Sequence, residues 1–253
     1  MKDLLCIVKS NKLIAENIYM MTLTLSEGAG CIRGGQFVNL STGDGSQLLR
    51  RPLGVMKVEG NDVSVCYQVK GGGTQNLAKT EAGQKLKILL PLGNGFNLDG
   101  KNSVAVIGGG VGVFPLIATI REHFKTKKFY SYIGFRNKNA VCLLNELEKS
   151  ERLTVVTDDG SYGEKGNAVE AYLKDADKIK ADCIIACGPP VMLKVLKQKL
   201  SERDNTLPCL VSLEERMGCG LGACLVCVCK KSDGTNARVC KDGPVFDINE
   251  VQL

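Results

Sequence analysis

A group of cysteines near the C-terminus has the spacing of an iron–sulfur ligand set. Cys219, Cys224 and Cys227 stand at C-x4-C-x2-C, and Cys229 and Cys240 follow them. This opening spacing is typical of the plant-type [2Fe–2S] cluster, in which a loop wraps three thiolates around the irons and a fourth arrives from elsewhere. The segment therefore predicts a one-electron redox centre.

Glycines between these cysteines support the same interpretation. Gly218, Gly220 and Gly222 can adopt positive φ and leave room for a bulky inorganic group. A structural zinc site is the alternative, but its ligands usually come as two C-x2-C pairs or as mixtures of cysteine and histidine. The cysteine segment has one C-x2-C pair, and the single histidine, His123, is distant in sequence. We therefore favour iron–sulfur over zinc.

The composition is that of a globular protein that works in a reducing compartment. Of 253 residues, 44% are hydrophobic and 24% are charged, and the formal net charge is +6. The sequence contains no run of about 18 apolar residues, so we expect no membrane-spanning helix. The N-terminus has too short an apolar core for a secretory signal. Twelve cysteines indicate free thiols available for metal, so we expect a cytoplasmic location. Basic residues without interleaved aromatics argue against a nucleic-acid surface.

The first hundred residues have the pattern of an antiparallel β-barrel. Short β-rich runs alternate with turns rich in Gly, Asn and Asp, and the connections are too short for crossover helices. Two stretches interrupt this pattern: Arg50, Arg51 and Pro52 in LLRRPLGV, and a glycine turn, 71–74, before an expected helix. Arginine offers a charged fork to phosphate, and such a turn presents free N–H groups. Together they indicate a site for the diphosphate of a dinucleotide.

From residue 102 onward the pattern changes to alternating strands and helices, including a helix expected over 141–150. This alternation predicts a parallel sheet with helices on both faces, whose ligands lie at the carboxyl ends of the strands. Four segments follow expected strands and are candidates for this edge: residues 108–112, 134–136, 158–160 and 187–190.

The glycine turn in this region departs from the usual dinucleotide fingerprint. Gly108 and Gly110 match the first two positions of G-x-G-x-x-G, but the third position is Val113. Arg136 stands near the end of the second strand, where an acidic ribose ligand would be usual. We therefore expect a dinucleotide-binding domain of a different lineage. Because an arginine at this position could bind a 2′-phosphate, Arg136 leaves NADP as an alternative to NAD.

The order of these features resembles the ferredoxin–NADP reductase superfamily. A barrel with Arg-Pro and GGGT segments precedes a nucleotide domain with GGGxGxxPL and CGPP, and the cysteine loop follows. The ending, SLEERMGCGLGACLVCVCK with VCKDGPVF, is similar to the electron-transfer subunits of dihydroorotate dehydrogenase B. The resemblance covers essentially the whole chain. It implies a FAD-binding β-barrel domain at 1–99, an NAD-binding α/β domain at 100–207 and a [2Fe–2S] domain at 208–253.

The resemblance also assigns site residues by position. The FAD site would comprise Arg51, Pro52, Leu53, Gly54, Cys66, Tyr67, Gln68, Gly73 and Thr74. The pyridine nucleotide would lie over Gly110, Gly112, Pro115, Asp158, Cys187, Gly188 and Pro189. The cluster ligands would be Cys219, Cys224, Cys227 and Cys240. No separate catalytic acid or base is implied.

Three positions leave alternatives open. Gly54 stands where the family usually has Ser or Thr, whose hydroxyl contacts the flavin. Cys187 corresponds to a cysteine that approaches the nicotinamide in the wider superfamily, but a small packed residue at a strand end would look the same. Cys229 points the same way as Cys227 in a strand and competes with Cys240 as the fourth ligand.

The implied function is electron transfer. NAD exchanges a hydride and a [2Fe–2S] cluster passes one electron, so flavin, which can do both, must sit between them. The resemblance implies a subunit of an NAD-dependent dihydroorotate dehydrogenase of pyrimidine (UMP) biosynthesis, in a heterotetramer with two copies of an FMN-containing catalytic subunit. The chain alone should not oxidise dihydroorotate. The alternatives are the FAD/[2Fe–2S] subunit of an NADH-dependent ferredoxin–NADP reductase or sulfide dehydrogenase, and, outside the enzymes, a zinc-stapled binding module.

Overall fold

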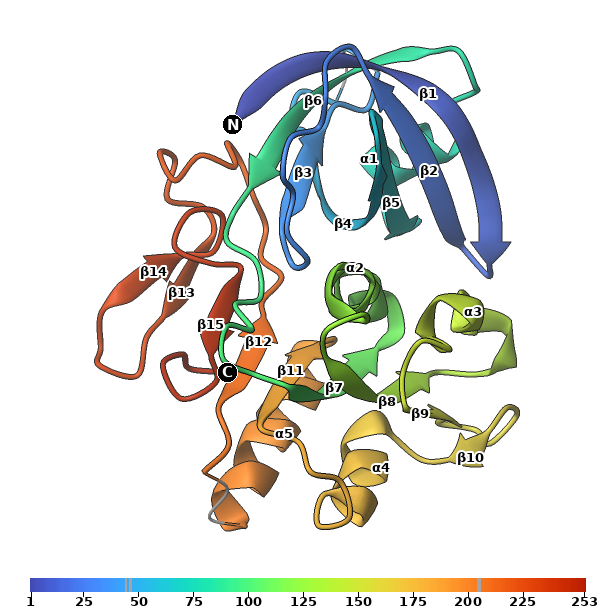
Figure 1. Ribbon diagram of the computed structural model, residues 1–253. Helices are drawn as coiled ribbons and strands as arrows, with labels where there is room; N and C mark the ends of the chain where they lie inside the picture. The colour runs from blue at the N-terminus through green and yellow to red at the C-terminus, as the bar shows by residue number, and fades with distance from the viewer. Residues whose placement is uncertain (44, 46, 204–205) are drawn as a thin grey trace.

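The computed structural model describes residues 1–43, 45, 47–203 and 206–253, which form a barrel, a sheet flanked by helices and a cysteine-rich C-terminal segment. Figure 1 shows the barrel, in blue to teal, above the sheet, with the C-terminal segment, in orange to red, along one side of both. The predicted combination of an antiparallel barrel and a parallel α/β sheet is confirmed. No helix of the described residues is long and apolar enough to cross a membrane.

Six strands close the N-terminal barrel in the order β1-β2-β5-β4-β3-β6, and every neighbouring pair is antiparallel. The strands are β1 (Lys2–Ala15), β2 (Ile18–Leu25), β3 (Phe37–Leu40), β4 (Arg51–Glu59), β5 (Asp62–Gln68) and β6 (Lys85–Leu92). Alternate residues of β2 and β5, among them Met21, Leu23, Val63 and Val65, are fully buried in the barrel core. The expected helix is present as α1 (Gly72–Ala78), but it begins within the glycine turn rather than after it.

The second unit is a seven-stranded sheet in the order β10-β9-β8-β7-β11-β12-β15. Its strands are β7 (Ser103–Gly109), β8 (Lys128–Phe135), β9 (Arg152–Thr157), β10 (Glu164–Lys165), β11 (Cys183–Cys187), β12 (Cys209–Ser212) and β15 (Val245–Asp247). All neighbours are parallel except β15, which runs antiparallel to β12. The chain moves outward from β7 in both directions, so β7 and β11 form a topological switch point, where α/β sheets bind ligands.

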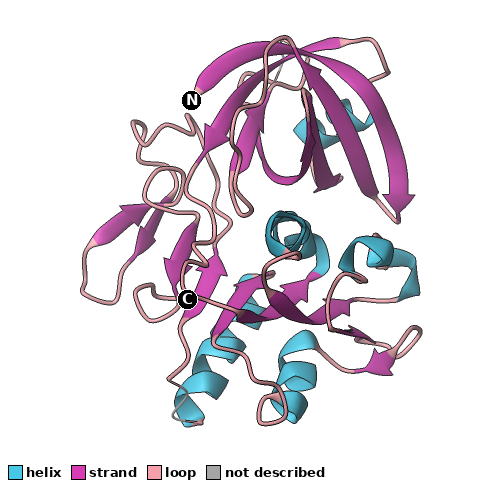
Figure 2. Cartoon of the chain, in the orientation of Figure 1, coloured by secondary structure: helices cyan, strands magenta, loops and turns pink. Residues whose placement is uncertain are grey.

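Helices cover both faces of this sheet (Figures 1 and 2). They are η1 (Gly110–Gly112), α2 (Val113–His123), η2 (Lys138–Ala140), α3 (Leu144–Leu147), α4 (Ala168–Asp175) and α5 (Pro190–Glu202). The helix α2 lies on the face toward the barrel, whereas α4 and α5 lie on the opposite face. The helix expected over 141–150 is shorter than predicted, because Leu143 adopts a left-handed φ of 54° and α3 starts only after it.

The C-terminal segment extends the sheet and also forms a separate hairpin. Its strands β12 and β15 belong to the seven-stranded sheet. The hairpin pairs β13 (Val228–Lys230) with β14 (Asn236–Arg238). Two strands beyond residue 208 thus complete the sheet of the preceding segment. The boundary between the NAD-binding and [2Fe–2S] domains at this residue stays a prediction.

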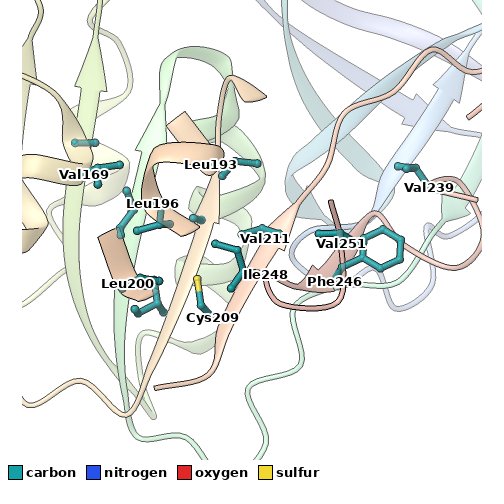
Figure 3. Packing of buried hydrophobic residues seen from close by; sticks show 14 of the residues in the cluster. Val169, Leu193, Leu196, Leu200, Cys209, Val211, Val239, Phe246, Ile248 and Val251 are labelled. Atoms are coloured by element: carbon teal, nitrogen blue, oxygen red, sulfur yellow. The ribbon is translucent and has the colours of Figure 1, made fainter. Parts of the chain in front are cut away.

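One apolar cluster joins the sheet to the C-terminal segment (Figure 3). Leu193, Leu196 and Leu200 repeat at helical spacing along α5, and the same cluster contains Cys209 and Val211 of β12. All five side chains are buried. Burying a leucine side chain contributes about 2 kcal/mol, so this packing fixes the strand that leads into the cysteine loop (residues 218–229).

Candidate functional site

The main cleft lies where the barrel, the sheet and the C-terminal segment meet, and it has a volume of about 260 Å³. Residues expected to bind FAD form its barrel wall: Pro52, Leu53, Gly54, Cys66, Tyr67, Gln68 and Thr74. Two residues expected near the nicotinamide, Pro115 and Cys187, line it from the sheet side. The cleft thus brings the predicted flavin and nicotinamide positions next to each other, as hydride exchange requires.

Arg51 reaches from β4 to the first turn of α1. Its guanidinium lies over Gly73 so closely that a Cβ there would come within 2.0 Å of Arg51 Nε. The same guanidinium donates to Gln47 Oε1 at 2.6 Å, and Thr74 Oγ1 accepts the Gly71 N–H at 3.2 Å. Only glycine permits this approach. The result is a cationic fork beside the start of a helix, an arrangement that fits a diphosphate.

Gly54 marks the place where the barrel wall meets α2. A Cβ on Gly54 would lie 3.6 Å from Pro115 Cδ, which is an ordinary van der Waals distance. Steric crowding therefore does not explain the missing hydroxyl at this position. The backbone keeps its place in the cleft wall without it.

The glycine turn after β7 presses against the end of β11. A Cβ on Gly112 would lie 2.5 Å from the Cys187 carbonyl oxygen and 2.6 Å from Gly188 N, so no side chain fits there. The Cys187 side chain lines the cleft yet is almost completely buried. Burial raises the pKa of this thiol. Cys187 is thus an uncharged, packed residue at the strand end that also lines the cleft at the predicted nicotinamide position.

A second cavity of about 400 Å³ opens at the carboxyl edge of the sheet. Gly110, Asp158 and Pro189 line it, together with Arg136. The residues expected to bind the pyridine nucleotide therefore divide between this cavity and the main cleft. The tight contact of Gly112 with the end of β11 lies between the two groups, which suits a ligand that spans the switch point.

The four expected cluster ligands come together as two pairs. Cys219 and Cys224 are neighbours, and the Cys219 N–H donates to Cys224 Sγ at 3.4 Å. Cys227 and Cys240 form the second pair, in which the Cys240 N–H donates to Cys227 Sγ at 3.4 Å. Each iron of a [2Fe–2S] cluster takes two thiolates besides the bridging sulfides, so two pairs fit the two irons.

Backbone donors surround these thiols. The Leu221 N–H donates to Cys219 Sγ at 3.2 Å, and the Gly222 N–H donates to Cys240 Sγ at 3.1 Å. Burial disfavours the charged form of Cys219, but the surrounding N–H groups outweigh it and lower its pKa to about 6. Burial raises the pKa of Cys240 to about 12. Metal binding would displace the proton of this second thiol, since the thiolate is the ligand form.

The alternatives to this ligand set fit less well. The thiols form two pairs, which suits two metal ions, whereas a structural zinc site gathers four ligands around one ion. Cys229 lies on β13 opposite Ala237, and the apolar cluster contains it together with Cys227 and Cys240, so burial does not distinguish the candidate ligands. Cys240 is the residue that pairs with Cys227, which supports it as the fourth ligand.

Sequence reasoning missed one wall of the main cleft. The missed lining residues that follow β12 are Leu213, Glu214, Glu215 and Met217. Glu214 is exposed as a residue, but the protein around its carboxyl reduces solvation and raises its pKa, while the positive charge of Lys70 acts to lower it. Its one sequence signal is its place two residues after an apolar strand, at the carboxyl edge of the sheet.

Comparisons with known proteins agree with this geometry. Residues 214–252 match the family model of the iron-sulfur cluster binding domain of dihydroorotate dehydrogenase B, and residues 106–198 match an oxidoreductase NAD-binding domain. The dihydroorotate dehydrogenase B (NAD(+)) electron transfer subunit of Streptococcus mutans serotype c is 38% identical over 255 residues, 97% of this chain and 96% of that protein. The chain belongs to the family of dihydroorotate dehydrogenase B electron-transfer subunits.

A second relative and a solved structure are also similar to this chain. The subunit of Caldanaerobacter subterraneus subsp. tengcongensis is 39% identical over 251 residues, 96% of each chain. A solved NADH-dependent reduced ferredoxin–NADP oxidoreductase, studied for flavin-based electron bifurcation, aligns with a TM-score of 0.88 at 27% identity, covering 98% of this chain and 89% of that one. These relationships confirm the oxidoreductase assignment and the cofactor set of FAD, [2Fe–2S] and NAD. The roles of individual site residues stay predictions.

Proposed function

We propose that this electron-transfer subunit carries electrons from a dihydroorotate-oxidising catalytic subunit to NAD+, within pyrimidine (UMP) biosynthesis. The observation that carries the proposal is the main cleft, whose walls come from the barrel, the sheet and the segment that leads to the cysteine loop. Pro115, Cys187 and Met217 line this cleft and would contact a flavin held there. Bound FAD would supply both hydride exchange with NAD and single-electron exchange with the cluster.

The residues of the cleft bind and orient rather than move protons. Arg51, whose guanidinium lies against Gly73, would hold the diphosphate of FAD. Tyr67 lines the barrel wall, and its hydroxyl donates to Asn11 Oδ1 at 3.0 Å, which fixes the ring. The single histidine, His123, ends α2 at the opposite terminus from the cleft, so no imidazole base serves this site.

Residues expected to bind the pyridine nucleotide line both the main cleft and the second cavity, so a bound nucleotide would reach both. Gly110 and Pro189 form the backbone edge along which it lies, and Gly112 keeps that edge narrow. Asp158 faces the same cavity, where a carboxylate can accept hydrogen bonds from ribose hydroxyls. The Asp158 carboxylate therefore supports NAD, whose ribose hydroxyls are free to donate hydrogen bonds. The positive charge of Arg136 would instead favour the 2′-phosphate of NADP.

The partner is an FMN-containing catalytic subunit, in a heterotetramer with two copies of each chain. Cys224 is exposed, and the neighbouring Leu221, Leu225 and Val226 are 43%, 62% and 55% exposed. Apolar side chains beside a redox centre favour a protein partner there, and a single-electron transfer needs that partner close. Twelve free cysteines suit a reducing compartment, and we infer that the complex acts in the cytoplasm.

The test uses the purified full chain with and without its catalytic subunit. Alone, it should show flavin and iron–sulfur absorption and reduce ferricyanide with NADH, but leave dihydroorotate unchanged. Addition of the catalytic subunit should restore dihydroorotate-dependent formation of NADH. Turnover of dihydroorotate by the chain alone, or a colourless protein after anaerobic reconstitution with iron, sulfide and FAD, would overturn the proposal.

A second candidate rests on the structural match to the ferredoxin–NADP oxidoreductase at 27% identity. In that case the chain would serve a partner that reduces ferredoxin. The relatives at 38% identity over nearly the whole chain favour dihydroorotate dehydrogenase B instead. Cofactor analysis of the co-purified partner separates the two: FMN alone supports the first candidate, and additional [4Fe–4S] clusters support the second.

A further inference from the structure

Arg238 ends the strand β14 and links two parts of the ligand set. Its Nη1 donates to the Gly222 carbonyl at 3.3 Å, across to the cysteine loop. Its Nε and Nη2 donate to the two carboxylate oxygens of Asp242, each at 3.0 Å. The guanidinium therefore spans from the turn that carries Cys240 to the loop that carries the other three expected ligands.

Gly222 is the residue that this arginine restrains. Its backbone has a left-handed φ of 79°, and its N–H donates to Cys240 Sγ at 3.1 Å. A Cβ on Gly222 would lie 2.7 Å from Lys241 Cδ, so the residue sits directly on the 238–242 turn. Because Arg238 holds the carbonyl of Gly222, it limits rotation of this glycine and keeps the N–H directed at the sulfur.

A surface ion pair alone would not account for this arrangement. The Arg238–Asp242 pair is about one-third exposed on each side, and exposed pairs contribute little to stability. The pair does more than bridge two charges, however, because the third hydrogen bond reaches a carbonyl on a different segment. The guanidinium is also close enough to Cys227 and Cys240 for their charges to interact with it.

We propose that Arg238 is a positioning residue for the cluster, which raises the cluster's reduction potential by keeping the Gly222 N–H on Cys240 Sγ. Hydrogen bonds to ligand sulfurs stabilise the more negative, reduced cluster and so raise its potential. The inference rests on the proposed function, in that the cluster must be present. Through this contact, the chain sets how readily the cluster accepts an electron from the catalytic subunit.

The test is a redox titration of the isolated, FAD-loaded chain, followed by electron paramagnetic resonance of the reduced cluster. Arg238→Gln removes the fork and the charge, and Arg238→Lys keeps the charge but cannot bridge the same two partners. Both variants should make reduction of the cluster about tenfold less favourable, a fall of about 59 mV for one electron. An unchanged potential in Arg238→Gln, or a wild-type potential in Arg238→Lys, would refute the positioning role.

Two further variants complete the design. Arg203→Gln breaks another Arg–Asp pair, in which Nη2 donates to both carboxylate oxygens of Asp177 just after α5, and should leave the potential unchanged. An equal fall there would also refute the inference. If neither Arg238 variant retains its cluster, Asp242→Asn carries the test. If Asp242 orients Arg238, its replacement should lower the reduction potential of the cluster. Removal of the negative charge of Asp242 would by itself raise that potential, so a rise or an unchanged potential would refute the positioning role. A wild-type chain without a cluster would instead refute the proposed function.

Discussion

Substitution of Gly112 by alanine tests whether the contact between the glycine turn and β11 controls the nucleotide site. Gly112 has φ −63° and ψ −12°, a helical conformation that any residue can adopt. The effect of the substitution therefore comes from the new Cβ alone. That atom would lie 2.5 Å from the Cys187 carbonyl oxygen, against 3.4 Å for an ordinary contact.

The magnitude follows from these distances. The two backbones must separate by about 0.9 Å, and neither can rotate away, as a side chain would. Overpacking costs about 1–3 kcal/mol, and we take about 3 because both groups are backbone. Replacing glycine by alanine in a helical position returns about 1 kcal/mol. The expected net loss in the free energy of unfolding is about 2 kcal/mol.

The same displacement should impair NADH oxidation. A misplacement of about 1 Å can cost up to about 100-fold in rate, so we expect kcat/KM for NADH with ferricyanide to fall at least tenfold. Urea unfolding measures the stability, and steady-state kinetics measure the second effect. Gly28→Ala is the matched control, because a Cβ there would meet only Asn61 Oδ1 at 3.8 Å. A Gly112→Ala protein with wild-type stability and wild-type kcat/KM would refute the reasoning.

Three further predictions concern the ligand set, cofactor choice and a buried amide. Cys240→Ser should lose most of the iron–sulfur absorption while Cys229→Ser keeps it, and the reverse result would reassign the fourth ligand. Arg136→Ala should raise KM about tenfold for NADPH and little for NADH; equal changes would exclude a 2′-phosphate contact. Asn39 is buried, and its Nδ2 donates to the Cys219 carbonyl at 3.5 Å. Asn39→Asp should cost about 3 kcal/mol at pH 7 and progressively less as the pH falls toward 4, because burial raises the pKa of the new carboxyl and protonation restores a donor. Thermal unfolding across this range checks it, and a constant difference would contradict it.

Local patterns were sufficient for most elements and for the kind of metal centre. The alternation in IYMMTLTL identifies β2, and the spacing of Cys219, Cys224 and Cys227 identifies the cluster, because both properties depend on neighbours along the chain. The prediction of a helix over 141–150 was wrong in its length, because only Leu144–Leu147 are helical. Its apolar pattern continues, but Leu143 leaves the helical region of φ, and periodicity does not record a single left-handed residue.

Contacts between distant segments decided what the pattern left open. Cys240 pairs with Cys227 because the β13–β14 hairpin returns the chain to the loop, although Cys229 is nearer in sequence. Glu214 joins the cleft because β12 ends beside β11 at the switch point, and no spacing marks it. Gly112 matched a nucleotide motif, but its lack of a side chain is required by β11. Spacing describes the local backbone, whereas the close approach of two backbones depends on how the sheet orders its strands.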